Sequence, residues 1–93
     1  MLLKYIQHFV NPEGRDFFPQ WFASTTEKMQ ALKGFITAHY ILDPVDLHKV
    51  HFFMYFDDAA ALERWAATPA HEAALKALSA YWVKPYVMQQ AVL

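Results

Sequence analysis

The sequence contains no cysteine and only two glycines among its 93 residues. Without cysteine there is no disulfide framework, no thiolate metal site and no cysteine nucleophile. A chain without disulfides suits a reducing compartment, so we expect a cytoplasmic protein. No apolar run reaches the roughly 20 residues that a membrane-spanning helix needs, and we therefore expect no membrane partner.

An excess of charge of either sign is also missing. Eight basic residues stand against nine acidic residues, the formal net charge is −1, and neither sign clusters along the chain. Binding to nucleic acid depends on a strong positive field that attracts phosphate groups. We therefore expect no nucleic acid partner.

Apolar and aromatic side chains, by contrast, are abundant. Hydrophobic residues make up 56% of the sequence, and eight Phe, five Tyr and three Trp are among them. A chain of this length buries only about 65% of the surface of its unfolded form, so a monomer cannot easily enclose so many large side chains. We expect a single domain over residues 1–93 that hides the surplus in a subunit interface or a ligand cavity.

The hydrophobic pattern predicts four strands and three helical segments. Residues 2–10 are largely apolar on both parities, which is typical of a central strand. A first helix carries Pro19 in its first turn and ends at Gly34, which can adopt a left-handed cap. The expected helix N-caps are Asp16, either Asp57 or Asp58, and Thr68, and the other strands are residues 35–42, 49–56 and 85–93.

This β-α-β-β-α-β order is that of the split βαβ or ferredoxin-like arrangement. It gives an α+β fold with one four-stranded antiparallel sheet and helices on one face. The other face would be bare in a monomer, although either parity of residues 2–10 carries large apolar side chains. We therefore expect a homodimer in which a second sheet covers this face. The alternatives for the covered side chains are Tyr5 with Phe9 and Ile6 with Val10.

Several short motifs follow one another at regular spacing along the chain. They are Val-Asn-Pro-Glu-Gly at residues 10–14, Leu-Lys-Gly-Phe at 32–35 and Phe-Asp-Asp-Ala-Ala-Ala-Leu-Glu-Arg-Trp at 56–65. Residues 65–71 then match the pattern W-x-x-[ST]-P-x-H. Together these motifs resemble the antibiotic biosynthesis monooxygenase family of dimeric α/β barrels over essentially the whole chain. The resemblance implies a small-molecule pocket between the sheet and the helices of each protomer.

Two residues of the last motif could carry the chemistry of such a pocket. Trp65 can stack its indole on a flat aromatic substrate and orient a carbonyl or hydroxyl through its N–H, or it is simply core. His71 follows the Thr68 cap, where the positive end of a helix disfavours imidazolium. The neutral ring can then accept a proton, or it only makes a local hydrogen bond near the cap. We expect His71 as the catalytic residue and Trp65 as a substrate-binding residue.

Four further residues are expected to bind the substrate. His8 enters the pocket if its parity on the first strand faces the helices, and otherwise lies in the dimer barrel. Trp21, Phe22 and Tyr81 would wall the cavity, and Tyr81 could also donate a hydrogen bond.

The histidines do not form a metal motif. A hairpin centred at residues 45–46 pairs His39 with Phe52. It pairs His51 with Tyr40, so the two histidines point to opposite faces unless the register slips by one residue. No histidine pair has the close helical spacing of a zinc motif. We therefore expect no structural metal.

The resemblance also bears on the cofactor. Haem-degrading members of the family combine an Asn on the first strand and a Trp on the second helix with an axial His about ten residues later. Here Leu75 occupies that axial position and the first strand has no Asn before Asn11, so we expect no haem. The cofactor-free oxygenases often place an Asn one helical turn before the Trp, where this chain has Ala61.

Two functions therefore compete. The first is a cofactor-independent monooxygenase or related oxidoreductase that needs no cofactor and acts on a small electron-rich phenol, quinol or enol. The second is a non-catalytic dimeric module, for small-ligand binding or stress response, and the missing Asn favours it. A cavity smaller than about 300 Å³ would also favour the second function.

Overall fold

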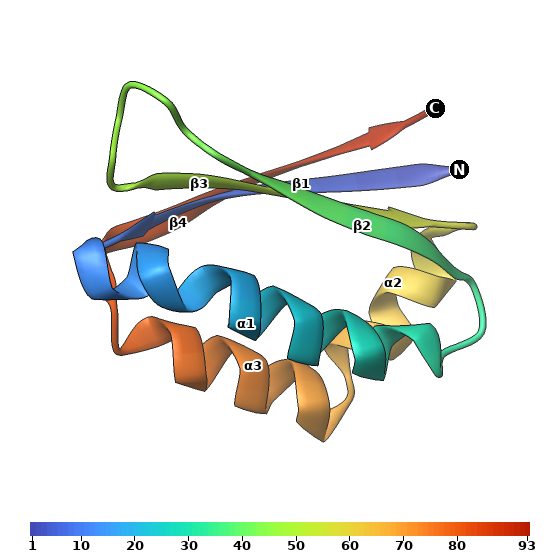
Figure 1. Cartoon of the computed structure of the whole chain (residues 1–93). Coiled ribbons are helices and arrows are strands. Elements are labelled where there is room, and N and C mark those ends of the chain that lie inside the picture. Colours follow the sequence, from blue (N-terminus) through green and yellow to red (C-terminus); the bar gives the residue numbers. More distant parts are fainter.

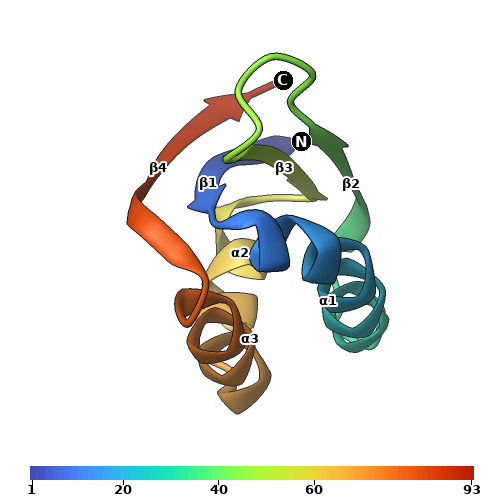
Figure 2. The same cartoon turned by 60° about the vertical axis from the view of Figure 1, so that its left-hand side comes forward.

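The computed structural model describes residues 1–93 and contains a four-stranded antiparallel sheet with helices packed on one face (Figure 1). The sheet curves over these helices (Figure 2). The elements are β1 Leu2–Val10, α1 Pro12–Gln30, β2 Phe35–Leu42, β3 Lys49–Phe56, α2 Ala59–Ala66, α3 Pro69–Ser79 and β4 Trp82–Val92. The strand order β2-β3-β1-β4 places β1 in the interior of the sheet and confirms the predicted ferredoxin-like α+β fold. None of the helices has the length and apolar character needed to span a bilayer.

Helix α1 begins earlier than the sequence analysis predicts. The side-chain Oδ1 of Asn11 accepts a hydrogen bond from the backbone N–H of Gly14 at 2.8 Å, which makes Asn11 the N-cap. Pro12 follows it in the first turn, where a missing N–H costs nothing. Asp16 and Pro19 therefore both lie inside the helix. The predicted Asp16 cap is wrong because Asn followed by Pro is itself a strong helix start.

The next two helices begin where the sequence predicts. Asp58 Oδ1 accepts a hydrogen bond from the N–H of Ala61 at 2.9 Å and caps α2. Thr68 Oγ1 accepts one from the N–H of His71 at 3.1 Å and caps α3. These caps place Trp65 in the last turn of α2 and His71 in the first turn of α3.

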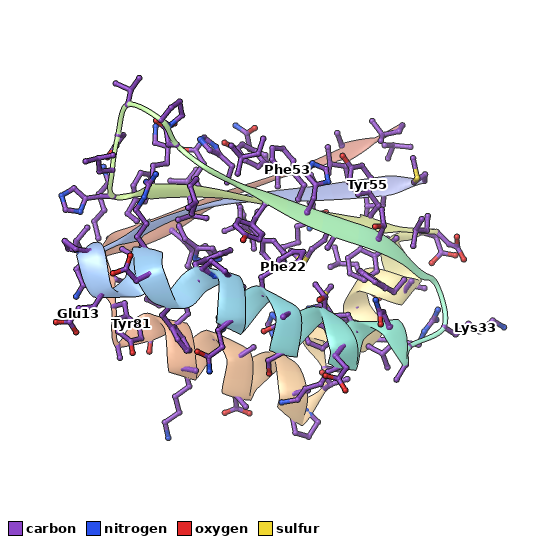
Figure 3. The ribbon with its side chains drawn as sticks, in the orientation of Figure 1. Glu13, Phe22, Lys33, Phe53, Tyr55 and Tyr81 are labelled. Carbon is purple, nitrogen blue, oxygen red and sulfur yellow. The ribbon has the colours of Figure 1, made fainter.

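The two faces of the sheet carry different side chains. Ile6 and the even-numbered residues of β3 point to the helices and are each at most 6% exposed. On the other face Tyr5 stacks on Phe53 and Phe53 on His39, with ring centroids 4.8 and 4.7 Å apart. Phe53 and Tyr55 lie on this side, away from the helices (Figure 3). Of the two parity alternatives, the one with Tyr5 on the helix-free face is therefore observed. We call this the outer face.

Strands β2 and β3 pair one residue away from the predicted register. His39 pairs with Phe53, and Ile41 pairs with His51. Both histidines consequently point to the outer face, and the prediction of opposite faces is wrong. The reason lies in the loop between the strands. The Asp43 side chain accepts hydrogen bonds from two loop amides, and the backbone N–H of Asp43 donates to the Lys49 carbonyl at 3.1 Å. This turn is centred on residue 46 instead of between residues 45 and 46.

Strand β4 begins at Trp82, three residues before the predicted start. It pairs only with β1 and is an edge strand. Its register shifts opposite Gln7 and Phe9, so Pro85 falls within an irregular stretch of pairing. An edge strand tolerates proline at such a point because no ladder hydrogen bond is required from it.

Candidate functional site

A cavity lies between the inner face of the sheet and the helices, where the family resemblance implies a pocket. Its empty space measures about 330 Å³ when counted out to the mouth. The volume that the centre of a water molecule can occupy in this space is only about 20 Å³, which is room for about one water molecule. A larger ligand therefore enters only if side chains move. The eleven lining residues are Lys4, Ile6, His8, Trp21, Thr25, Phe52, Met54, Trp65, His71, Ala74 and Leu75.

The rings of Trp65 and His71 meet edge to face in this lining. Their centroids are 5.5 Å apart and their planes are inclined by 82°. Thr68 holds the short link between them, since its hydroxyl donates to the Trp65 carbonyl at 2.7 Å and accepts from the His71 N–H at 3.1 Å. The hydrogen bond near the cap is thus made by the backbone of His71 and leaves its ring free to face the cavity.

The electrostatic surroundings of His71 favour the neutral ring. Burial lowers the pKa of His71, and the positive charge of Lys4 lowers it further. The positive end of helix α3 acts in the same direction. A neutral imidazole at pH 7 can accept a proton, which is the property that a general base requires.

His8 is a fully buried residue of the cavity lining. It has the same parity as Ile6, faces the helices and is 0% exposed. Aromatic rings surround it, with Trp82 stacked at 6.1 Å and Tyr86 at 5.7 Å between centroids. Neither ring nitrogen of His8 has a hydrogen-bond partner, and burial lowers its pKa to about 4. The neutral ring therefore presents one donor and one acceptor to the cavity.

The depressed pKa of His8 predicts acid lability. The unfolded state, with a histidine pKa of about 6.5, binds more protons than the folded state between pH 6.5 and 4, so stability falls as the pH is lowered through this window. For a shift of this size the loss is on the order of 3 kcal/mol. Urea unfolding at pH 7 and pH 4 should show a smaller drop for His8→Leu than for the native chain. An equal drop in both proteins would contradict the assignment.

Lys4 also lines the cavity and is not among the residues predicted from the sequence. It lies on the same face of β1 as Ile6 and His8, and burial lowers its pKa. The single ion pair of the chain joins His51 to Asp43, so no carboxylate neutralises Lys4. The signal that could have found it is its even parity with His8, once that parity is known to face the helices.

Of the three residues predicted to wall the cavity, only Trp21 lines it. Its indole N–H donates to a backbone carbonyl of α3 at 2.9 Å. Phe22, the next residue of α1, points toward β2 and packs on Tyr40 with centroids 4.7 Å apart. Tyr81 lies beyond the end of α3, beside the start of α1, and packs on Phe17 at 5.1 Å (Figure 3). Neither Phe22 nor Tyr81 belongs to the lining.

A second group of polar side chains lies on the outer face. The Tyr5 hydroxyl and His51 Nδ1 are 2.6 Å apart, and His51 Nε2 is 2.8 Å from Asp43 Oδ2. Because a carboxylate can only accept, Nε2–H donates to Asp43 and Nδ1 accepts from Tyr5. The hydrogen bond from His51 and those from two loop amides hold the pKa of Asp43 well below its usual range. These linked hydrogen bonds from Tyr5 through His51 to Asp43 fix the β2–β3 loop to β1.

No three His, Asp or Glu side chains gather closely enough to hold a metal ion.

These features define a class of proteins, namely ferredoxin-like α+β chains with a cavity between the sheet and its helices. The family model described as "Antibiotic biosynthesis monooxygenase" matches residues 1–77. The chain belongs to the antibiotic biosynthesis monooxygenase family.

Solved structures show the same fold. The chain is similar to an antibiotic biosynthesis monooxygenase, with a TM-score of 0.86, 20% identity, and coverage of 100% of this chain and 98% of that one. It is also similar to a variant of SnoaB, a cofactor-independent oxygenase from Streptomyces nogalater, with a TM-score of 0.82, 16% identity, and coverage of 99% and 92%. Rv0793 from Mycobacterium tuberculosis gives a TM-score of 0.84 at 11% identity, with coverage of 99% and 93%. Comparison with curated proteins gives no match.

Proposed function

We propose that the chain is a cofactor-independent monooxygenase or related oxidoreductase that acts on a small electron-rich aromatic or quinol-type substrate. The observation that carries this proposal is the contact between Trp65 and a His71 whose pKa is lowered, both on the lining of one cavity. The likeness to SnoaB, a cofactor-independent oxygenase, supports it.

In the proposed mechanism His71 removes a proton from the substrate hydroxyl. The resulting anion passes an electron to dioxygen, and the protein contributes proton removal, stabilisation of the anion and a dry pocket. Trp65 provides the flat surface on which the substrate ring stacks. His8, a buried residue of the same lining, faces the other end of the substrate.

Oxygen consumption tests the proposal. The purified protein, with no added cofactor, should accelerate oxygen uptake by at least one member of a panel of anthrones, quinols and catechols. The control is the same panel with heat-denatured protein. Absence of acceleration across the whole panel would contradict the oxygenase proposal.

The cavity itself favours a second candidate function, a non-catalytic module that binds a small ligand or is filled by its own aromatic side chains. The volume open to the centre of a water molecule, about 20 Å³, falls far below the roughly 300 Å³ of an ordinary ligand pocket. Ala61 is 1% exposed, and its Cβ would lie 2.5 Å from a Cβ added at Gly34. This crowded position has little room for the Asn that cofactor-free oxygenases often carry there. Native mass spectrometry of the purified protein would reveal a retained ligand without turnover.

We further propose that residues 1–93 form one cytoplasmic domain that pairs as a homodimer through the outer face. The stacked rings of Tyr5, Phe53 and His39 on that face support the pairing, because a water-exposed aromatic layer of this kind is unusual in a monomer. Sedimentation equilibrium at micromolar concentration should give twice the mass of the chain. Phe53→Asp should give a monomer, whereas Val45→Asp, in the exposed loop, should not. A native chain that sediments as a monomer would contradict the proposal.

We also predict that the isolated protein contains no haem and binds it weakly. Leu75 lines the cavity where haem-degrading relatives carry the axial His, and a leucine side chain cannot ligate iron. Titration with haemin, followed through the Soret band, should show no stoichiometric tight complex. Tight binding with ring cleavage in the presence of a reductant would contradict the prediction.

A further inference from the structure

The cavity contains a basic side chain and nothing that balances its charge. Lys4 is part of the lining, but the lining includes no Asp and no Glu. The only ion pair of the chain lies on the outer face, on the other side of the sheet. A half-buried ammonium without a counter-ion costs free energy, and a negatively charged ligand would recover part of that cost.

The same lining carries polar atoms without partners. Both ring nitrogens of the fully buried His8 are unpaired. The indole N–H of Trp82, which stacks on His8 outside the lining, is also unpaired and gives His8 no hydrogen bond. Most buried polar groups in proteins have a hydrogen-bond partner, and each exception requires an explanation. A neutral imidazole offers one donor and one acceptor, which suits a hydroxyl or a carbonyl better than a second negative charge.

Lys4 and His8 are the right distance apart for a small ring compound. They are four residues apart on one strand, so their Cα atoms are roughly 13 Å apart. Their side chains point to the same face of the sheet, and a hydrogen bond of about 2.8 Å at each end leaves roughly 7 Å for the ligand. Ile6 lies between them on the same face of the strand, and the lining also includes the apolar side chains of Trp65 and Phe52.

We infer that the cavity selects an anionic aromatic compound whose carboxylate or phenolate binds Lys4 and whose opposite hydroxyl or carbonyl binds His8. This inference deepens the proposed function and rests on the part of it that assigns this cavity to a small molecule. It names a class of ligand. For a phenol whose hydroxyl faces Lys4 and His71, it also gives Lys4 the role of binding the phenolate charge that forms when His71 removes the proton.

Three single-ring probes separate the two contacts by isothermal titration calorimetry at pH 7. They are 4-hydroxybenzoate, its neutral analogue 4-hydroxybenzamide, and benzoate, which lacks the hydroxyl. The native protein should bind 4-hydroxybenzoate about 10- to 100-fold more tightly than the amide, the range expected for a charge-assisted hydrogen bond. It should also prefer 4-hydroxybenzoate to benzoate by about 10-fold.

Variants of Lys4 and His8 test which residue causes the preference for the acid and which causes the preference for the hydroxyl. Lys4→Met should abolish the preference for the acid over the amide, while Lys4→Arg, which restores the charge, should regain it. The matched control is Lys33→Met, because Lys33 extends into solvent beyond the end of α1 (Figure 3). His8→Leu should remove the preference for the hydroxyl and keep the preference for the acid. Melting temperatures report whether each variant folds.

The results that overturn the inference differ from those that overturn the oxygenase proposal. Equal affinity of the native protein for the acid and the amide would overturn the inference, as would no binding of 4-hydroxybenzoate at millimolar concentration. A charge preference that survives in Lys4→Met would do the same. Oxygen uptake is measured separately, so Lys4-dependent binding without turnover keeps the inference and removes the oxygenase.

Discussion

His71→Ala is expected to lower turnover by roughly a hundred- to ten-thousandfold, the usual contribution of a general base. The chain should still fold, because the helix cap depends on the backbone N–H of His71 and not on its ring. The ring itself is only partly buried and meets Trp65 edge to face. Oxygen uptake with the best substrate of the panel measures the loss, and the melting temperature measures the fold.

The matched control for this experiment is Glu72→Gln, an exposed neighbour in the same helical turn. It should leave turnover unchanged. If the native protein is the proposed oxygenase, it should also remain active below pH 6.5, since burial and Lys4 both lower the pKa of His71 and a base works only when deprotonated. Full activity in a normally folded His71→Ala protein would remove His71 from the mechanism.

Trp65→Ala is expected to destabilise the fold by about 3 to 5 kcal/mol, which is the usual cost of removing a large buried aromatic side chain. Trp65 is 3% exposed and belongs to the main hydrophobic cluster. A loss of this size is a large part of the roughly 5 to 15 kcal/mol that stabilises a typical domain. Urea unfolding followed by circular dichroism would measure it.

The milder variant Trp65→Phe distinguishes a core residue from a substrate platform. It keeps a ring in the cluster and should lose much less stability than Trp65→Ala. If Trp65 also binds substrate, Trp65→Phe should raise KM although the protein is folded. A loss below about 1 kcal/mol for Trp65→Ala would show that the side chain does not hold the core as the structure indicates.

Local chemistry explains which parts of the fold are predictable from the sequence. The caps at Asp58 and Thr68 are predictable because a short polar side chain before a helix satisfies free backbone amides. The start of α1 is missed because Asn and Pro are favoured both in turns and at helix N-termini. Asn11 and Pro12 are therefore compatible with either structure. The register of β2 and β3 is missed because the Asp43 side chain shifts the turn by half a residue, and residue spacing alone does not show this.

The site is partly predictable for a related reason. Trp65 and His71 flank a recognisable cap, so their closeness follows from a few residues of sequence. The position of His8 depends on which face of β1 meets the helices, and a strand that is apolar on both faces does not show that. Lys4 is missed for the same reason, since a lysine within an apolar strand gives no sign of which face it occupies. Phe22 is misplaced because helix periodicity does not tell which side of a wide apolar face meets the cavity.

A crystal structure of the protein with 1,4-naphthoquinone, the oxidised form of a quinol of the proposed substrate class, tests most directly whether this cavity is the small-molecule site. We expect a ring stacked on Trp65, with one oxygen within hydrogen-bond distance of His71 and the lining side chains moved apart. The largest hollow on the surface, about 690 Å³ and lined by residues of β4 such as Lys84, provides the alternative location. A ligand bound there or on the outer face, with the cavity still closed, would contradict the account.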